Sequence, residues 1–108
     1  MYNAFPVSHQ VVESVEFVKL PMITKYLYIY LSKLSNRYAD KNGWFWVSNK
    51  TLADNINATT RSIIRAKKQL KENGFLEYKV ITFDSGSLKA TIYRINHYLS
   101  INQYSKVT

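Results

Sequence analysis

The sequence predicts an α+β domain in which three helices are followed by a two-stranded antiparallel hairpin. Apolar residues recur at three- and four-residue spacing before residue 74 and alternate with polar residues after it. The change of period falls at Gly74, one of only three glycines. With 108 residues, 46% of them hydrophobic, the chain can build one modest core and therefore one domain.

The N-terminal segment, residues 1–20, is predicted to be an arm or a strand. Residues 11–20, VVESVEFVKL, alternate loosely between apolar and polar side chains and include two glutamates. A loose alternation of this kind is typical of an extended segment.

A helix over residues 21–36 and a short strand come next. Pro21 fits the first turn because its fixed φ is already helical. Four apolar residues form one stripe that should face the core: Ile23, Leu27, Leu31 and Leu34. Tyrosines and Ile29 widen the apolar surface past this stripe, so the helix is either central in the domain or also contacts a partner. The aromatic run WFWV at residues 44–47 then predicts a buried strand.

Two helices joined by about three residues follow this strand. Ser48 is a suitable N-cap for a short helix that ends near residue 55, and Thr59 can cap a second helix that stops at Gly74. Asn57 can adopt the left-handed conformation that a tight turn between them requires. This arrangement is a helix-turn-helix.

The last part of the chain predicts a β-hairpin. FLEYKVITF and LKATIYRI both alternate, and the DSGS between them contains Gly86, which can supply the positive φ of the turn. A hairpin directly after the second helix is a wing, so residues 21–96 are predicted to form a winged helix-turn-helix. Residues 97–108 fit either a short C-terminal helix or a tail.

Two stretches of this sequence resemble a known family. NGWFWVSNKTLADNI followed by NATTRSIIRAKKQLKENGFLE is similar to the N-terminal winged-helix domain of phage replisome organisers, plasmid replication initiators and DnaD-like primosome proteins of Gram-positive bacteria. The shared pattern is an aromatic before Ser-Asn-Lys, a Leu-Ala pair, a Thr or Ser cap, and Lys-Glu-Asn-Gly-Phe-Leu before the wing. It covers about residues 17–96. The resemblance implies a role in replication initiation, with replication proteins as further partners.

The resemblance also implies a homodimer. In DnaD-like domains, extensions outside the winged helix pair the subunits, and this chain carries apolar residues on both sides of its predicted winged helix. The segments expected to pair are residues 11–20 and residues 98–104.

The charge balance favours a polyanionic partner. Fifteen Lys and Arg against seven Asp and Glu give a net charge of +8, and the pI is about 9.7. Five of these cations lie between Asp54 and Glu72 without an intervening acid. A solvated charged face is the simpler explanation, but such a face normally carries glutamates at four-residue spacing. The second helix, about residues 60–73, is therefore predicted to be a recognition helix for double-stranded DNA.

The position of each side chain on this helix predicts its role. The first turns reach base edges, so the predicted base-reading residues are Thr60, Arg61 and Arg65. Phosphate contacts are predicted for Asn49, Lys50, Thr59, Ser62, Lys67, Lys68 and Lys71. Each small hydroxyl among these residues could equally touch a phosphate, a base edge or a thymine methyl group. Asn49 and Lys50 are explained just as well as ordinary exposed cap residues.

The wing is expected to contact the DNA backbone. The predicted contact residues are Lys79, Ser85, Gly86, Ser87 and Lys89. The tip is small enough to enter a minor groove, although Asp84 beside it would repel a phosphate.

Several classes of function are not expected. The chain has no cysteine and only two histidines, far apart, so neither a metal site nor a cofactor is predicted. Clustered carboxylates and a Gly-rich phosphate loop are lacking, so it is not expected to be an enzyme. It has no apolar run of about 18 residues and no signal peptide pattern, so a cytoplasmic protein without membrane contact is expected. Its tyrosines and tryptophans are attributed to the core rather than to stacking on single strands.

Three hypotheses for function remain. The first is sequence-specific binding of duplex DNA in replication initiation of a phage, a plasmid or another mobile element. The second is a small transcriptional regulator on the same fold. The third is a protein-interaction winged helix whose basic surface meets an acidic protein. The genomic position of the bound site separates the first two, and salt dependence with sequence preference separates both from the third.

Overall fold

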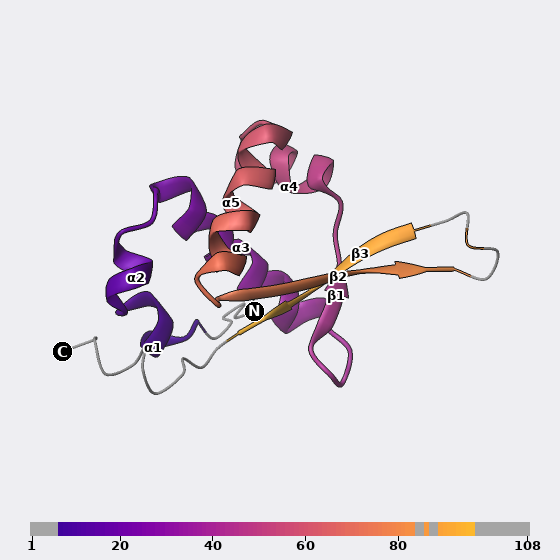
Figure 1. The fold of residues 1–108 in the computed structure, drawn as a ribbon, viewed down its shortest axis with the longest axis horizontal. Coiled ribbons are helices and arrows are strands. Elements are labelled where there is room, and N and C mark those ends of the chain that lie inside the picture. Colours follow the sequence, from indigo (N-terminus) through magenta and orange to yellow (C-terminus); the bar gives the residue numbers. More distant parts are fainter. Residues whose placement is uncertain (1–6, 84–85, 87–88, 97–108) are drawn as a thin grey trace, which may run out of the picture.

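The structure is a computed structural model that describes residues 7–83, 86 and 89–96. In this part of the chain the elements are α1 His9–Val12, α2 Val15–Val18, α3 Met22–Tyr38, β1 Trp44–Trp46, α4 Asn49–Ile56, α5 Thr60–Glu72, β2 Leu76–Thr82 and β3 Lys89–Ile95. The three strands form an antiparallel sheet in the order β1-β3-β2. The helices gather on one part of the sheet, and the β2–β3 hairpin projects away from them (Figure 1). This arrangement confirms the predicted α+β winged helix-turn-helix.

The N-terminal segment forms two short helices, so the prediction that residues 11–20 are extended, as a strand or an arm, is wrong. Ser8 and Ser14 cap α1 and α2, and each hydroxyl oxygen accepts the backbone N–H three residues later at 3.2 Å. Val11, Ser14 and Phe17 are all buried, and their three-residue spacing is helical. The loose alternation of apolar residues concealed this period. Val11 and Phe17 belong to the main core.

An aromatic cluster joins α2, α3 and the start of β2. The rings of Phe17, Tyr28 and Phe75 contact one another edge to face, with centroids 5.3 to 6.3 Å apart. Burial raises the pKa of Tyr28, whose hydroxyl donates to the backbone oxygen of Asn96 at 3.1 Å. Because α3 contacts α5 as well as β1 and β3, it is the central helix of the domain. Tyr26 on its outer side is nevertheless 51% exposed.

The sheet has one covered face and one open face. Tyr78 and Tyr93 are paired in register on the covered face. On the opposite face, Lys79 and Arg94 lie over the Trp44 ring, 4.4 and 4.6 Å from its centroid. The prediction that WFWV is a buried strand is therefore wrong in part. Phe45 and Val47 are buried, whereas Trp46 is 61% exposed, because none of the described elements covers that face.

Between Thr82 at the end of β2 and Lys89 at the start of β3, the structure describes Phe83 and Gly86. Gly86 has the predicted positive φ, 76°, and its N–H donates to the backbone oxygen of Phe83 at 2.7 Å. The predictions for Asp84, Ser85, Ser87 and residues 97–108 lie outside the described residues. Among the helices that are described, none combines the length and the apolar character that crossing a bilayer demands.

Candidate nucleic-acid interface

The helix-turn-helix consists of α4 and α5. Ser48 and Thr59 are their N-caps, and each hydroxyl accepts the backbone N–H three residues later, at 3.0 and 3.1 Å. Asn57 lies between the two helices in the left-handed conformation, with φ 57° and ψ 55°. Gly74, with φ 80°, follows the C-cap of α5. Both predicted caps and the predicted turn residue are confirmed.

Two opposite faces of α5 differ sharply in character. Ile63, Ala66 and Leu70 are buried against the rest of the domain. Exposed side chains at three- and four-residue spacing form the opposite side, which we call the outer row of α5: Thr60, Arg61, Ile64, Arg65, Lys68 and Lys71. The outer row contains four cations, and Glu72, exposed four residues after Lys68, adds one carboxylate at the C-terminal end of this side. All three predicted base-reading residues lie on it.

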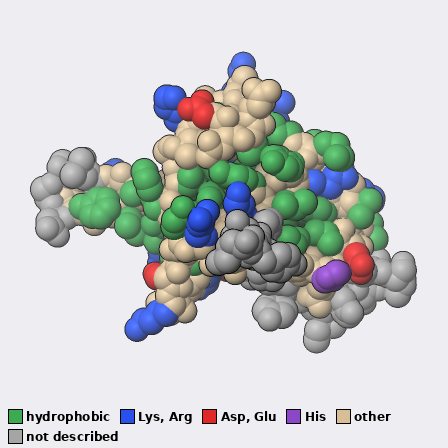
Figure 2. Space-filling view, turned by 180° about the vertical axis from the view of Figure 1, so that it is seen from behind, with side chains coloured by type: hydrophobic (Ala, Val, Ile, Leu, Met, Phe, Trp, Pro, Cys, Tyr) green, Lys and Arg blue, Asp and Glu red, His purple; other side chains and the backbone are tan. Residues whose placement is uncertain are grey.

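The reverse side of the domain has a different surface. Seen from behind, hydrophobic side chains cover much of the middle of the molecule, and the basic side chains lie apart from one another (Figure 2). Most of the large exposed apolar residues belong to α2, α3 and β1, namely Val15, Val18, Met22, Tyr26, Tyr38 and Trp46. On α5, by contrast, four exposed cations lie at three- and four-residue spacing.

Lys67 is not part of the basic surface, and the predicted phosphate contact by Lys67 is wrong. The residue is only 7% exposed, and its Nζ donates to Asn49 Oδ1 and to the hydroxyl of Tyr93. The ammonium also lies 4.7 Å from the centroid of the Tyr93 ring. Burial lowers the pKa of Lys67 to about 8 and raises the pKa of Tyr93 to about 12. Asn49 is half-buried, and its amide oxygen is engaged by Lys67 rather than open to solvent.

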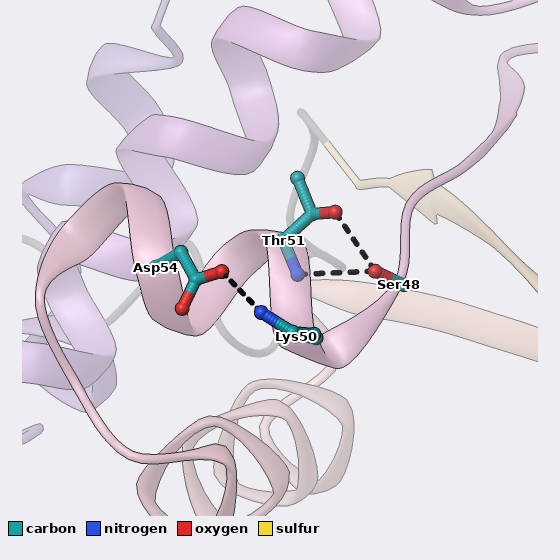
Figure 3. A network of polar contacts seen from close by, with 4 residues as sticks. All are labelled: Ser48, Lys50, Thr51 and Asp54. Carbon is teal, nitrogen blue, oxygen red and sulfur yellow. Dashed lines mark hydrogen bonds and ion pairs between the residues drawn. The ribbon is translucent and has the colours of Figure 1, made fainter.

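Lys50 is exposed but has an ionic partner on its own helix. Its Nζ lies 2.9 Å from Asp54 Oδ2, one turn later on α4 (Figure 3). The hydrogen bond with Asp54 raises the pKa of Lys50. The two side chains are 82% and 63% exposed, and pairs as open to water as this contribute little free energy. Lys50 therefore remains free to exchange Asp54 for a phosphate.

The remaining predicted phosphate contacts differ in accessibility. Lys68 is exposed, and Lys71 is exposed with its Nζ 4.6 Å above the ring of Tyr78 on β2. The hydroxyl of Thr59 donates to that of Ser62 at 3.0 Å, so these two side chains already bond to each other beside the start of α5.

On the wing, Lys79 lies away from the tip. It pairs in register with Ile92, whereas Thr82 pairs with Lys89 at the end of the described ladder. Its ammonium rests on Trp44, on the face of the sheet opposite to the helices. Lys89 is exposed beside the turn, as is Gly86. Of the predicted wing residues that the structure describes, Lys89 and Gly86 are therefore the ones that flank the tip.

The sequence prediction passed over one residue of the outer row. Ile64 is 55% exposed between the cations, although isoleucine usually faces a core. A helical projection of residues 60–72 reveals it, because Ile64 lies three residues after Arg61 and four before Lys68. Within the described residues there is no group of three or more His, Asp or Glu side chains that could hold a metal ion.

The fold and this surface define a winged helix-turn-helix protein with a basic second helix. The chain belongs to the helix-turn-helix domain family, whose sequence profile matches residues 18–76. The comparison with curated proteins finds no match.

Several solved structures share this fold. One is the N-terminal domain of a DNA binding protein, with TM-score 0.69 and 19% identity, covering 97% of this chain and 81% of that chain. A second, a Rep–DNA complex, has TM-score 0.66 and 22% identity, covering 96% and 83%. A third, a possible transcriptional regulator from Methanosarcina mazei Go1, has TM-score 0.55 and 18% identity, covering 98% and 82%.

Proposed function

We propose that this protein binds a specific sequence of double-stranded DNA through the outer row of α5 and the β2–β3 wing. The observation that carries the proposal is the placement of four exposed cations on one side of a capped helix whose other side is core. Unpaired like charges on one helix face repel one another, and a polyanion in the groove offsets that repulsion. A helix of this kind after a short turn fits the major groove of B-DNA.

The outer row divides into two parts by position. Arg61 and Arg65 lie in the first two turns of α5, where a forked guanidinium can donate to O6 and N7 of guanine. Lys68 and Lys71 lie one and two turns further on and donate to phosphates, which adds affinity without sequence choice. Lys71 is already directed along β2 by the Tyr78 ring, so it can meet the backbone between helix and wing.

For the biological role, we propose replication initiation in a phage, a plasmid or another mobile element. The resemblance of residues 17–96 to replisome organisers and plasmid initiators supports this role, as does the shared fold with a Rep–DNA complex. A small transcriptional regulator is the second candidate, because a possible transcriptional regulator also shares the fold. To distinguish the two roles, binding sites are selected from random duplexes and mapped to the source genome. Sites within a replication origin would favour replication initiation, and sites over promoters would favour a transcriptional regulator.

The binding proposal is tested by titrating single variants against a selected site and a scrambled duplex at two salt concentrations. Arg61→Ala and Arg65→Ala should each cost about 1–3 kcal/mol on the selected site and much less on the scrambled one. Lys68→Ala and Lys71→Ala should weaken both duplexes alike and lower the salt slope by about one unit each. Wild-type affinity should fall at least about tenfold between 50 and 200 mM salt.

Matched controls come from the outer side of α3. Arg37 and Lys33 are exposed cations on that helix, so Arg37→Ala and Lys33→Ala should leave both duplexes bound as tightly as before. All of these substitutions place alanine at exposed helical positions, where it supports the helix. If the two arginine variants weakened both duplexes equally, α5 would hold the backbone without reading bases. If no variant on the outer row mattered and binding were insensitive to salt, the proposal of DNA binding would be wrong.

A further inference from the structure

Ile64 stands in a position that neither packing nor helix formation explains. It is 55% exposed, and its neighbours on the outer row are Arg61, Arg65 and Lys68. The core side of α5 is filled by other residues, and isoleucine is a weaker helix former than the alanine or leucine that α5 uses elsewhere. A single exposed apolar residue is ordinary on most surfaces. Here it occupies the centre of the side that carries the cations.

The surface beside Ile64 is hollow rather than flat. Between α5 and β2 lies an open depression of about 430 Å³ lined by Ile64, Lys68, Lys71, Glu72 and Tyr78. Its walls combine two cations and the carboxylate of Glu72 with the side of an aromatic ring and the isoleucine. The cations outnumber the carboxylate, so the depression favours a partner that presents negative charge and an apolar group close together.

The major groove of DNA presents that combination at one kind of position. Its floor is a pattern of hydrogen-bond donors and acceptors, and the apolar group on it is the methyl group at C5 of a pyrimidine, flanked by phosphates. We propose that Ile64 recognises such a C5-methyl group, of thymine or of 5-methylcytosine, within the bound site. The proposal rests on the binding of duplex DNA by the outer row of α5.

The helix geometry fixes where this methyl group should lie. Residues rise by about 1.5 Å each along an α-helix, so Arg61, Ile64 and Arg65 span about 6 Å. Base pairs are about 3.4 Å apart, so these three side chains cover about two base steps. The methylated pyrimidine is therefore expected within two base pairs of a guanine that Arg61 or Arg65 reads.

The experiment removes and adds single methyl groups on the DNA. Duplexes of the selected site carry uracil in place of each thymine in turn, or 5-methylcytosine in place of each cytosine, and are titrated with wild type, Ile64→Ala and Ile64→Val. At one position, loss of the methyl group should weaken wild-type binding about fourfold, the value of one buried methyl group. Ile64→Ala should bind the methylated and unmethylated duplexes equally, and Ile64→Val should retain most of the difference. If the position at which the methyl group matters is a thymine, Ile64 recognises thymine; if it is a cytosine, Ile64 recognises 5-methylcytosine.

Val18→Ala is the matched control, because Val18 is a β-branched residue that is 58% exposed on α2, away from the outer row. It should keep the full fourfold difference. The proposal is overturned if wild type responds to no methyl group, or if Ile64→Ala keeps the wild-type response. A wild type that prefers the selected site yet ignores methylation refutes only the role of Ile64. A wild type without any preference between selected and scrambled duplexes refutes sequence-specific binding itself.

Discussion

The buried ammonium of Lys67 predicts an unusual pH dependence of stability. Burial lowers its pKa from an ordinary 10.5 to about 8 in the folded protein. Between these two values the unfolded chain holds a proton that the folded protein has released. Stability rises with pH wherever the unfolded state binds more protons, so the contribution of Lys67 increases from about pH 8 upward. Replacing Lys67 with methionine, which has a similar length and no charge, removes this effect.

The magnitude follows from the pKa difference and the two lost hydrogen bonds. The lowered pKa corresponds to about 3 kcal/mol against the charged form at neutral pH. In wild type, the hydrogen bonds to Asn49 and Tyr93 offset this cost by about 1 kcal/mol each. Lys67→Met loses both the cost and the bonds, so it should be more stable than wild type by about 1 kcal/mol at pH 7. By about pH 9.5 the wild type regains about 2 kcal/mol. The two stability curves should therefore cross between about pH 8 and 9.

Urea unfolding followed by circular dichroism, repeated across this pH range, measures both curves. The quantity of interest is the difference in the free energy of unfolding between wild type and variant, because other titrating groups cancel in it. Lys68→Met is the control, since Lys68 is exposed on the same helix and its substitution should leave the pH dependence unchanged. A difference between wild type and Lys67→Met that stays constant with pH would refute the lowered pKa of the buried Lys67 ammonium.

Three further predictions concern the fold and the assembly. Asn57→Ala should lower the free energy of unfolding by about 1 kcal/mol in a thermal melt, whereas Asn57→Gly should leave it almost unchanged. The left-handed φ of 57° suits Gly, which has no Cβ, and Asn, whose short polar side chain can hydrogen-bond locally, but it is unfavourable for Ala; equal effects of the two substitutions would contradict this reason. Phe17→Ala should cost about 3–5 kcal/mol in the same assay, since the ring is buried against Tyr28 and Phe75, and a small loss would mean that α2 contributes little to the core. The homodimer stays a prediction, which sedimentation of free and DNA-bound protein checks; a monomer in both states at high concentration would rule it out.

Features that depend on neighbouring residues could be predicted from the sequence. Ser48 and Thr59 cap the backbone three residues away, and Asn57 needs only its own left-handed φ, so each leaves a local signal. The outer row of α5 is also local, because one helix turn decides which side chains share a face.

Features that depend on distant residues could not be predicted in this way. Lys67 follows the same spacing as the other cations, but its partners Asn49 and Tyr93 lie 18 and 26 residues away. The three-residue spacing of Val11, Ser14 and Phe17 runs across the two four-residue helices α1 and α2, and its middle member, Ser14, is a polar residue that is fully buried, so apolar residues alone do not reveal it. The aromatic run around Trp46 predicts an interior position, yet the exposure of Trp46 depends on whether another layer covers that face of the sheet.

Helix α5 is held on three sides. Gln69 accepts a hydrogen bond from Thr24 of α3, Lys67 connects α5 to α4 and β3, and Lys71 rests on Tyr78 of β2. These contacts hold α5 against α3, α4 and the sheet, so the proposed complex would have a defined distance between the bases under α5 and the backbone beside the wing. A duplex with a different groove width or twist must then deform to fit, and that deformation costs more in stiff sequences than in flexible ones. Base pairs that no side chain touches would thus affect affinity through their flexibility, with the DNA rather than the protein as the partner that changes shape.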